Sequence, residues 1–418
     1  MTNELRFVGD EDTLISTVND WLIEQAQGQT TVEKLFEGCC NRLVAIGVPI
    51  SRARLVFRTL HPLYDSISLS WNTDEEVGRS GLLHGRSDTS EDWRTSPFLH
   101  LIKGGLPFLR RRLIGEGALL DFPVLTGIRD AGATDYIAYA VSFTGDDYGA
   151  NESNGIVGFW ATNRESGYTA ADIKALLRIQ SRLAVACKVT ITEEITRNVL
   201  ATYLGPDAGR QVLNGSIRRG DGETIYAVVW YNDLRRSTRL TESMPADQYL
   251  ALLNAYFECT AGAVLANQGD VLRFVGDAVL AIFPIRDGGI SATEACQRAL
   301  EAAGEAERRL AALNQERQAE GKVEIDFGIG LHLGDVVYGN IGVSERLEFS
   351  VIGTVANEVA RLEGLTKVLG RRVLATKIFA DNVPVAWDNL GEQSIEGALA
   401  PLTVFAPASG RSAIKKPA

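Results

Sequence analysis

The order of hydrophobic patterns after residue 223 constrains the fold of this chain more than any other feature of its sequence. Residues 225–231 form an uninterrupted apolar run, which is typical of a strand buried on both faces. Farther along, apolar residues alternate with polar residues or glycine over 323–331, which predicts a half-buried strand. The expected elements are, in order, strand 225–231, helix 246–266, hairpin strands 270–275 and 278–283, helix 291–320 and strand 323–331. This order predicts a ferredoxin-like βαββαβ core with additions.

The composition of the 418-residue chain is that of a globular protein with two or three domains. Its formal net charge is −11 and its only long basic run is Arg110-Arg111-Arg112, so we expect no nucleic-acid partner. No apolar run approaches the roughly 20 residues that a membrane helix needs. The first residues have no basic flank leading into an apolar stretch, so we expect no secretory signal. The five cysteines are scattered without CxxC spacing, which argues against a disulfide framework and a structural zinc site. We therefore expect a cytoplasmic protein without a membrane span.

The first 168 residues predict a separate α+β domain. Its helical patterns cover 12–25 and 31–46, and its strand patterns cover 54–57, 137–141 and 155–160. Helices followed by an antiparallel sheet indicate a sensor-type module of the GAF or PAS kind.

A linking segment, residues 169–222, follows this domain. Thr169 and Asp172 have the spacing of a capping box, and apolar residues recur at helical steps beyond them, so we expect a long helix towards Tyr203. This helix either packs on the core of its own domain or dimerises and carries a signal, and periodicity alone does not choose between the two. Residues 223–407 form the next domain, and residues 408–418 are expected to be a flexible tail.

Two aspartates stand out in the βαββαβ region. Asp233 comes directly after the first strand, and Asp277 lies in the hairpin turn. The strands involved are often neighbours in such a sheet, which would bring the two carboxylates together. The repulsion between them is best relieved by a hard divalent cation. Mg²⁺ with carboxylates and phosphate oxygens suits a nucleoside triphosphate. On spacing alone, however, a strand terminator and a turn residue are the commoner roles of aspartate at these positions.

Several segments in this region also carry a resemblance to a known family. They are Ala227–Thr238, Gly269–Phe283, Gly328–Gly342 and Phe349–Glu363. Through these segments, residues 223–406 resemble the catalytic domain of the class III nucleotidyl cyclases, the adenylate and guanylate cyclase superfamily. The N-terminal half is similar to the sensor-type region of soluble bacterial adenylate cyclases, through residues 59–62 and 132–136.

The resemblance implies a role for each matched residue. Asp233 and Asp277, with the carbonyl of Leu234, would bind two Mg²⁺ or Mn²⁺ ions per site. Asn357 and Arg361 match the family's transition-state pair, in which Asn357 would hold the ribose and Arg361 would stabilise charge on the α-phosphate. The two are four residues apart on one helix, so they project from the same face.

The resemblance also implies a phosphate-binding turn and a dimer. Backbone N–H groups of the turn that contains Arg236, Ser237 and Thr238 would face the phosphate oxygens. Two catalytic domains of this family pack head to tail, so each site would combine Asp233 and Asp277 of one chain with residues of the other. These are Arg273, Thr354, Asn357 and Arg361. We therefore expect an active homodimer.

Some positions depart from the family pattern. Arg273 stands in place of the base-reading lysine and Thr354 in place of its aspartate partner. Arg273 can donate to adenine and the Thr354 hydroxyl can accept from it, so adenine remains readable, although the pair discriminates less. Arg236 replaces the glycine of the phosphate-binding turn. Glu396 replaces a basic residue of many relatives and cannot neutralise the leaving pyrophosphate.

These observations predict an adenylate cyclase that converts ATP to 3′,5′-cyclic AMP and pyrophosphate by two-metal in-line attack at a homodimer interface. An unidentified ligand or partner of the N-terminal domain would regulate it. A cyclase acting on GTP or a pyrimidine triphosphate is one alternative. Another is a degenerate nucleotide-binding regulatory protein without turnover, although all four chemistry residues (Asp233, Asp277, Asn357 and Arg361) are present.

Overall fold

The computed structural model describes residues 11–73, 75–84, 90–143, 155–286, 288–394 and 401–408. The chain forms two compact units, Met1–Val199 and Leu200–Ala418. The boundary falls inside the segment 169–222 that was assigned to a linking helix. The finer division into domains, linker and tail stays a prediction.

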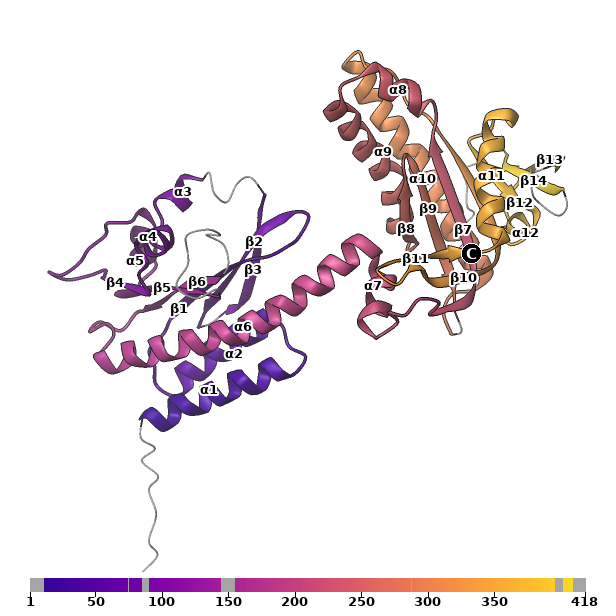
Figure 1. Cartoon of the computed structure of the whole chain (residues 1–418). Coiled ribbons are helices and arrows are strands. Elements are labelled where there is room, and N and C mark those ends of the chain that lie inside the picture. The colour runs from indigo at the N-terminus through magenta and orange to yellow at the C-terminus, as the bar shows by residue number, and fades with distance from the viewer. Residues whose placement is uncertain are drawn as a thin grey trace, which may run out of the picture. The chain divides into compact units, whose positions relative to one another are not determined.

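The N-terminal unit is an antiparallel sheet with helices on both faces (Figure 1). Its sheet order is β3-β2-β1-β6-β5-β4. Its elements are α1 (Glu11–Gln27), α2 (Val32–Ala45), β1 (Arg52–Arg58), β2 (Tyr64–Asn72), β3 (Glu75–Leu83), α3 (Glu91–Arg94), α4 (Pro97–Gly104), β4 (Phe108–Arg112), α5 (Pro123–Asp130), β5 (Asp135–Ser142), β6 (Gly155–Thr162) and α6 (Ala170–Leu204). The α+β prediction is confirmed, and the likeness to GAF or PAS modules stays a prediction.

Strand β5 shows why both faces of this sheet are covered. Ile137 and Tyr139 pack in a core with α1, α2 and α6. Tyr136 and Ala138 point the other way and pack in a second core with α4 and α5. Successive side chains of a strand face opposite sides, so the apolar run over residues 136–141 needs a helix layer on each side.

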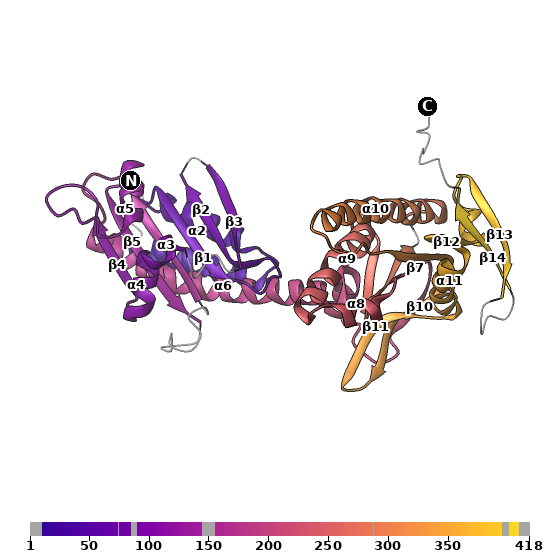
Figure 2. The same ribbon diagram turned by 90° about the horizontal axis from the view of Figure 1, so that it is seen from above.

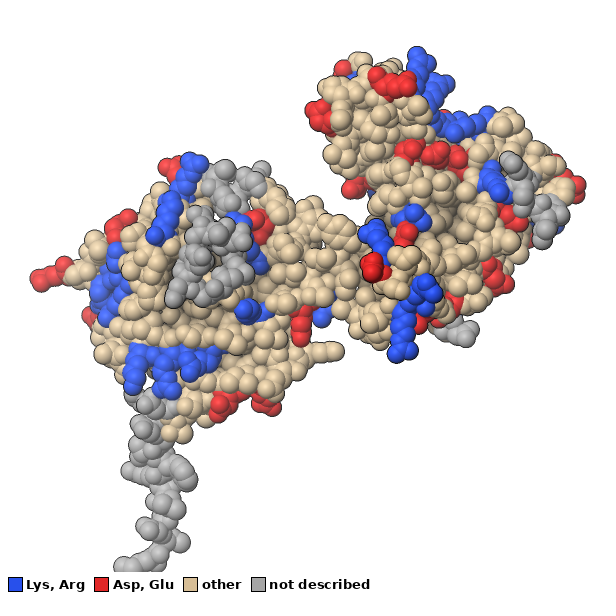
Figure 3. Space-filling view, viewed as in Figure 1, with Lys and Arg blue, Asp and Glu red and all other residues tan. Residues whose placement is uncertain are grey.

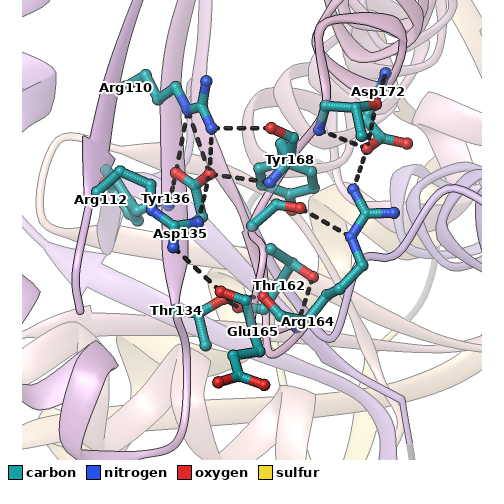
Figure 4. Close-up of polar contacts among 12 residues, drawn as sticks. Arg110, Arg112, Thr134, Asp135, Tyr136, Thr162, Arg164, Glu165, Tyr168 and Asp172 are labelled. Carbon is teal, nitrogen blue, oxygen red and sulfur yellow. Dashed lines mark hydrogen bonds and ion pairs between the residues drawn. The ribbon is translucent and has the colours of Figure 1, made fainter. Parts of the chain in front are cut away.

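The start of α6 is held by the predicted capping box. The Thr169 N–H donates to Asp172 Oδ2 at 2.7 Å, and the Asp172 N–H donates to Thr169 Oγ1 at 3.1 Å. Arg164 forms an ion pair with the same Asp172 carboxylate (Figure 4). These contacts satisfy N–H groups that the first turn of a helix leaves unpaired.

A buried carboxylate, Asp135, ties the sheet to the residue just before α6. Its side chain is fully buried and accepts from Arg110 Nη2 at 2.6 Å and from the Tyr168 N–H at 2.9 Å (Figure 4). It also accepts from the Tyr136 N–H at 3.0 Å. A buried charge needs such partners, so this cluster joins β4 and β5 to the entry of α6.

Helix α6 packs on its own unit over most of its length. Its buried residues run from Leu176 to Ile191 and belong to the N-terminal core, whereas Val189 is 40% exposed. The core-packing interpretation therefore holds for this part of the helix. Signal transmission along its remaining turns stays a hypothesis.

The C-terminal unit is built on one mixed sheet in the order β13-β14-β12-β10-β7-β9-β8, with β11 paired to β10. Its elements are α7 (Pro206–Leu213), β7 (Gly222–Leu234), α8 (Ser237–Ser243), α9 (Ala246–Ala266), β8 (Asp270–Val275), β9 (Ala278–Ile285), α10 (Ala292–Ala319), β10 (Phe327–Val343), β11 (Arg346–Ile352), α11 (Thr354–Leu369), β12 (Val373–Thr376), α12 (Lys377–Ala380), β13 (Trp387–Gln393) and β14 (Leu402–Pro407). The antiparallel order β10-β7-β9-β8 is that of a βαββαβ fold, so the ferredoxin-like prediction is confirmed.

Helices cover both faces of this sheet (Figure 2). Helices α9 and α10 pack on one face, while α7 and α11 pack on the other. Helix α9 is, among the described residues, the one helix long and apolar enough to cross a membrane by composition. Its residues Leu252, Tyr256 and Val264 are buried in the core, which accounts for its apolar character.

The prediction of a half-buried strand over 323–331 is wrong. Strand β10 begins at Phe327 and is buried on both faces through Gly334. Its glycines are the reason, because α11 packs directly on them. A Cβ on Gly330 would lie 2.5 Å from the Val359 carbonyl oxygen of α11. The glycines that looked like the exposed face of the strand are therefore contact points for a helix.

Charged side chains of both signs are distributed over the viewed face (Figure 3). Lys and Arg occur there in separate groups with Asp and Glu between them. All five cysteines are described, buried and free. The expectation that the chain has no disulfide framework is therefore met in the described residues.

Candidate active site

Strand pairing brings the two predicted metal-binding aspartates together. Asp233 is the second-last residue of β7 and lies opposite Ala278 of β9, while Asp277 is the residue that precedes β9 in the hairpin turn. The two carboxyl groups interact directly, and burial together with the nearby Asp277 charge raises the pKa of Asp233 from 3.8 to about 6. Asp277 Oδ2 is buried and has no hydrogen-bond partner among the described residues.

Two further charged residues, both on α11, complete this environment. Lys367 Nζ lies 3.8 Å from Asp233 Oδ2. Burial and the Asp233 charge raise the pKa of the Glu363 carboxyl from 4.5 to about 7. Sequence analysis missed both residues; their spacing of four on one helix was the available signal. Three carboxyl groups beside one ammonium leave an excess of negative charge, which is the environment that a divalent cation neutralises.

The residues present fit a hard metal ion. Mg²⁺ and Mn²⁺ take carboxylate oxygens, and the unpartnered Asp277 Oδ2 next to Asp233 offers such ligands. The Leu234 backbone amide favours the ionised form of the Asp233 carboxyl, although burial and the Asp277 charge outweigh it and raise the pKa. That the Leu234 carbonyl is a further ligand stays a prediction. No cluster of three or more His, Cys, Asp or Glu side chains with metal-binding geometry occurs in the described residues.

The raised pKa of Asp233 predicts a pH-dependent response to metal. Folded Asp233 holds its proton up to about pH 6, whereas in the unfolded chain it loses it near 3.8, so the folded state binds more protons between these values. Stability without metal therefore falls as the pH rises through this window. Mn²⁺ competes with the proton, so we expect the metal to raise Tm clearly at about pH 7.5 and hardly at about pH 5. Thermal unfolding with and without Mn²⁺ measures this, and an equal rise at both pH values would contradict it.

Asn357 and Arg361 lie on the exposed side of α11. The opposite side of this helix is buried through Val355, Val359 and Leu362. Both Asn357 and Arg361 are exposed, as their spacing predicted, and no hydrogen bond or ion pair joins either of them to the aspartates within the described part of the chain. The structure of one chain thus brings together the two aspartates but not the second pair.

The two candidate base-reading residues differ in their surroundings. Arg273 on β8 has Nε 3.0 Å from Glu348 Oε1 of β11, without the alignment of a hydrogen bond. Thr354 is the exposed first residue of α11, directly after Gly353. Glu348 is a residue that sequence analysis missed, because nothing in its local pattern indicates that β11 lies near β8.

The turn after β7 carries backbone strain at Arg236. This residue has φ 61° and ψ 30°, in the left-handed region that favours glycine. Ser237 and Thr238 begin α8 directly after it. The turn therefore keeps the conformation that a glycine would adopt without strain. Glu396 lies outside the described residues.

Replacing Arg236 with glycine should stabilise the protein. The change removes the Cβ clash of the left-handed conformation, so we expect the free energy of unfolding to rise by about 1 kcal/mol. Arg236→Ala is the matched control, because it removes the charge but keeps the Cβ. Chemical denaturation of both variants measures the difference. Equal gains in the two would show that the charge rather than the backbone is responsible.

Comparison with known proteins places this site in a family. Residues 223–383 match the family described as "Adenylate and Guanylate cyclase catalytic domain". The chain is 34% identical over 148 residues to adenylate cyclase 1 of Rhizobium meliloti (strain 1021), covering 35% of this chain and 22% of that protein. It is 32% identical over 172 residues to an adenylate cyclase of Anabaena cylindrica, covering 40% of this chain and 33% of that protein. The chain thus spans a third or less of the length of these curated relatives.

Among solved structures, the adenylyl cyclase CyaB from P. aeruginosa is 21% identical, with a TM-score of 0.42, and the match covers 46% of this chain and 97% of that one. The aspartates, Asn357 and Arg361 all lie within the matched family region. Residues 223–383 therefore belong to the adenylate and guanylate cyclase catalytic domain family, and the chain carries a class III nucleotidyl cyclase domain.

Proposed function

We propose that this protein converts ATP to 3′,5′-cyclic AMP and pyrophosphate. The observation that carries the proposal is the half-buried pair Asp233 and Asp277, with one buried, unpartnered carboxylate oxygen, inside a matched cyclase domain. Two relatives with about a third of their residues identical are named adenylate cyclases, which supports the reaction class. We also propose that the protein is cytoplasmic.

The proposed reaction joins the ribose 3′-oxygen to the α-phosphorus and breaks the bond from that phosphorus to the oxygen that leaves with pyrophosphate. The 3′-hydroxyl loses its proton to solvent water in this step. Asp233 and Asp277 would hold two Mg²⁺ or Mn²⁺ ions, which when bound favour the ionised 3′-oxygen and neutralise phosphate charge. Asn357 would orient the ribose, and Arg361 would donate to the α-phosphate oxygens as their charge grows.

A homodimer accounts for the separation of these groups. Asn357 and Arg361 are exposed and lack contacts to the aspartates of their own chain in the described residues. In the proposed dimer, the aspartates of one chain face the partner's Asn357 and Arg361. Twofold symmetry then produces two equivalent sites, and a monomer has none complete.

Glu348 supports adenine as the base that is read. Its carboxylate lies 3.0 Å from Arg273 Nε, so the proposed pocket places an acceptor beside a donor. The acceptor suits the amino group of adenine and repels the carbonyl oxygen of guanine. This pair compensates for Thr354, whose hydroxyl can either donate or accept.

Replacing Glu348 with glutamine should reduce the preference for ATP. The amide can donate to guanine as well as accept from adenine, so we expect the ATP/GTP ratio of kcat/KM to fall about tenfold. Thr354→Asp adds an acceptor and should raise the same ratio. Glu345→Gln, in the turn before β11, is the matched control. An unchanged ATP/GTP ratio in the Glu348 variant would contradict the proposal that this residue contacts the base.

The proposed function is tested with purified protein and each of four nucleoside triphosphates, with Mg²⁺ or Mn²⁺, the products being separated by chromatography. Cyclic AMP as the main product supports the proposal. Cyclisation of GTP, CTP or UTP alone would make the chain a cyclase of different specificity. Nucleotide binding without any cyclic product would support a degenerate regulatory protein.

We also infer that the N-terminal unit regulates the cyclase domain. Helix α6 continues in sequence from the core of the N-terminal unit to Leu204, and α7 begins two residues later. Within the C-terminal unit, α7 is anchored by Asp207, which accepts from Arg286 and Arg210. These contacts hold the pKa of the Asp207 carboxyl well below its usual range despite burial, so the anchor is ionised throughout the neutral range.

A further inference from the structure

The N-terminal unit contains a cavity of about 700 Å³ that the proposed reaction does not use. It lies on the face of the sheet opposite α1, α2 and α6, between the strands and the segments that carry α3, α4 and α5. A volume of this size is typical of small-molecule sites. The aspartate pair of the cyclase domain belongs to the other unit, so this cavity is separate from the proposed active site.

The walls of the cavity are largely aromatic and aliphatic. Tyr136 and Phe159 are buried in the floor with ring centroids 5.0 Å apart, and Trp93 and Phe98 are half-buried. Strand β2 adds the hydroxyl groups of Ser66 and Ser68 on this side, while its alternate residues face the core. An apolar wall with a few hydroxyl groups fits a ligand with an apolar body.

One cationic side chain in the cavity wall lacks an anionic partner among the described residues. Arg54 of β1 lies opposite Phe159 of β6, and its guanidinium carbon is 5.9 Å from the centroid of that ring. Arg58, four residues farther along the same face of β1, instead forms an ion pair with Asp65, with Nη1 3.6 Å from Oδ1. The guanidinium of Arg54 therefore has donors available for an anion, and a carboxylate matches their geometry.

From these observations we infer that the cavity binds a small organic carboxylate with an aromatic or aliphatic body. The body packs against Trp93, Tyr136 and Phe159, and the carboxylate accepts hydrogen bonds from Arg54. Asp92 also lines the cavity, and it repels a second anionic group, so the ligand carries one negative charge.

The floor of the cavity adjoins the cluster that holds the start of α6. Tyr136 faces the cavity, and its N–H donates to the buried Asp135, which also accepts from the Tyr168 N–H directly before the helix (Figure 4). A ligand that shifts Tyr136 would act on the entry of α6 through these two contacts. This consequence rests on the proposed cyclase function, whereas binding itself does not.

Calorimetric titration of the full-length protein tests the binding. The probes are 1-naphthoate, indole-3-acetate, 4-phenylbutyrate and decanoate, each paired with its primary amide. We expect at least one carboxylate to bind with Kd below about 0.1 mM and its amide to bind at least about tenfold more weakly. Failure of every carboxylate to bind, or equal affinity of acid and amide, would overturn the inference. Tighter binding of the zwitterion tryptophan than of any carboxylate would overturn the assignment of the head group.

Variants locate the bound probe. Arg54→Gln should weaken carboxylate binding about tenfold and leave the amide unaffected, whereas Arg52→Gln, on the same face of β1 but outside the cavity lining, should change neither. Val157→Phe fills part of the cavity and should abolish binding. Equal effects of the Arg52 and Arg54 variants would place the carboxylate elsewhere. Because calorimetry does not depend on turnover, loss of binding and loss of cyclase activity are read separately.

Discussion

Asp277→Ala should lower the rate of cyclic AMP formation by about a thousandfold or more, and Asp233→Ala should have a similar effect. Each change removes one of two adjacent carboxylates that the proposed metal ions require. The fold should remain intact, because the loss of one carboxylate relieves its repulsion with the other, which contributes to the raised pKa of Asp233. Steady-state rates with saturating Mn²⁺ and thermal unfolding of the same samples measure both effects.

The control for this prediction is Asp247→Ala, an exposed aspartate in the first turn of α9. It should keep the rate and the metal-induced rise in Tm, whereas both aspartate variants should lose that rise. A rate close to that of the parent in Asp233→Ala or Asp277→Ala would contradict the proposal that these residues bind the metal ions. A low rate with a large fall in Tm without metal would show that the carboxylates serve the fold instead.

Mixing Asp277→Ala chains with Arg361→Ala chains should restore activity from two inactive proteins. In the mixed dimer one site carries both lesions, while the other combines intact aspartates with an intact Arg361. After free exchange of equal amounts, half of the dimers are mixed and half of their sites are intact, so we expect about a quarter of the parent activity. Arg361 is exposed, so its replacement should leave the fold of each chain unchanged.

A mixture of Asp277→Ala with Asp233→Ala is the matched control for this experiment. Both lesions then fall on the same half of a site, so every site of the mixed dimer lacks one aspartate and activity should stay absent. Restoration in this control would mean that the aspartates of one site come from different chains. A lack of restoration in the first mixture, with exchange demonstrated by differently tagged chains, would contradict the shared site.

Much of the catalytic fold could be predicted because its signals are local. The apolar run that ends before Asp233 and the Gly276-Asp277 turn place two strands, and helix patterns of the right length connect them. In a βαββαβ sheet such strands are neighbours, so the adjacency of Asp233 and Asp277 followed from the order of the elements, and the register of β7 on β9 agrees with it.

Contacts that depend on how helices and strands pack could not be predicted from the sequence. The alternation of glycine with apolar residues in β10 has the period of a half-buried strand, but only the position of α11 decides whether the glycine side meets water or a helix. In the same way, Lys367 and Glu363 reach Asp233 because α11 lies across the sheet, and Glu348 reaches Arg273 because β11 folds back beside β8.

By itself the sequence determined the order of the elements in the βαββαβ core and the residue types available for chemistry, since periodicity, capping and turn chemistry act over a few neighbouring residues. The tertiary structure alone decided the charge around the aspartates, the strain at Arg236 and the cavity beside Arg54. These depend on side chains far apart in the chain, and the free energy of bringing them together is set by the packing of whole helices and strands.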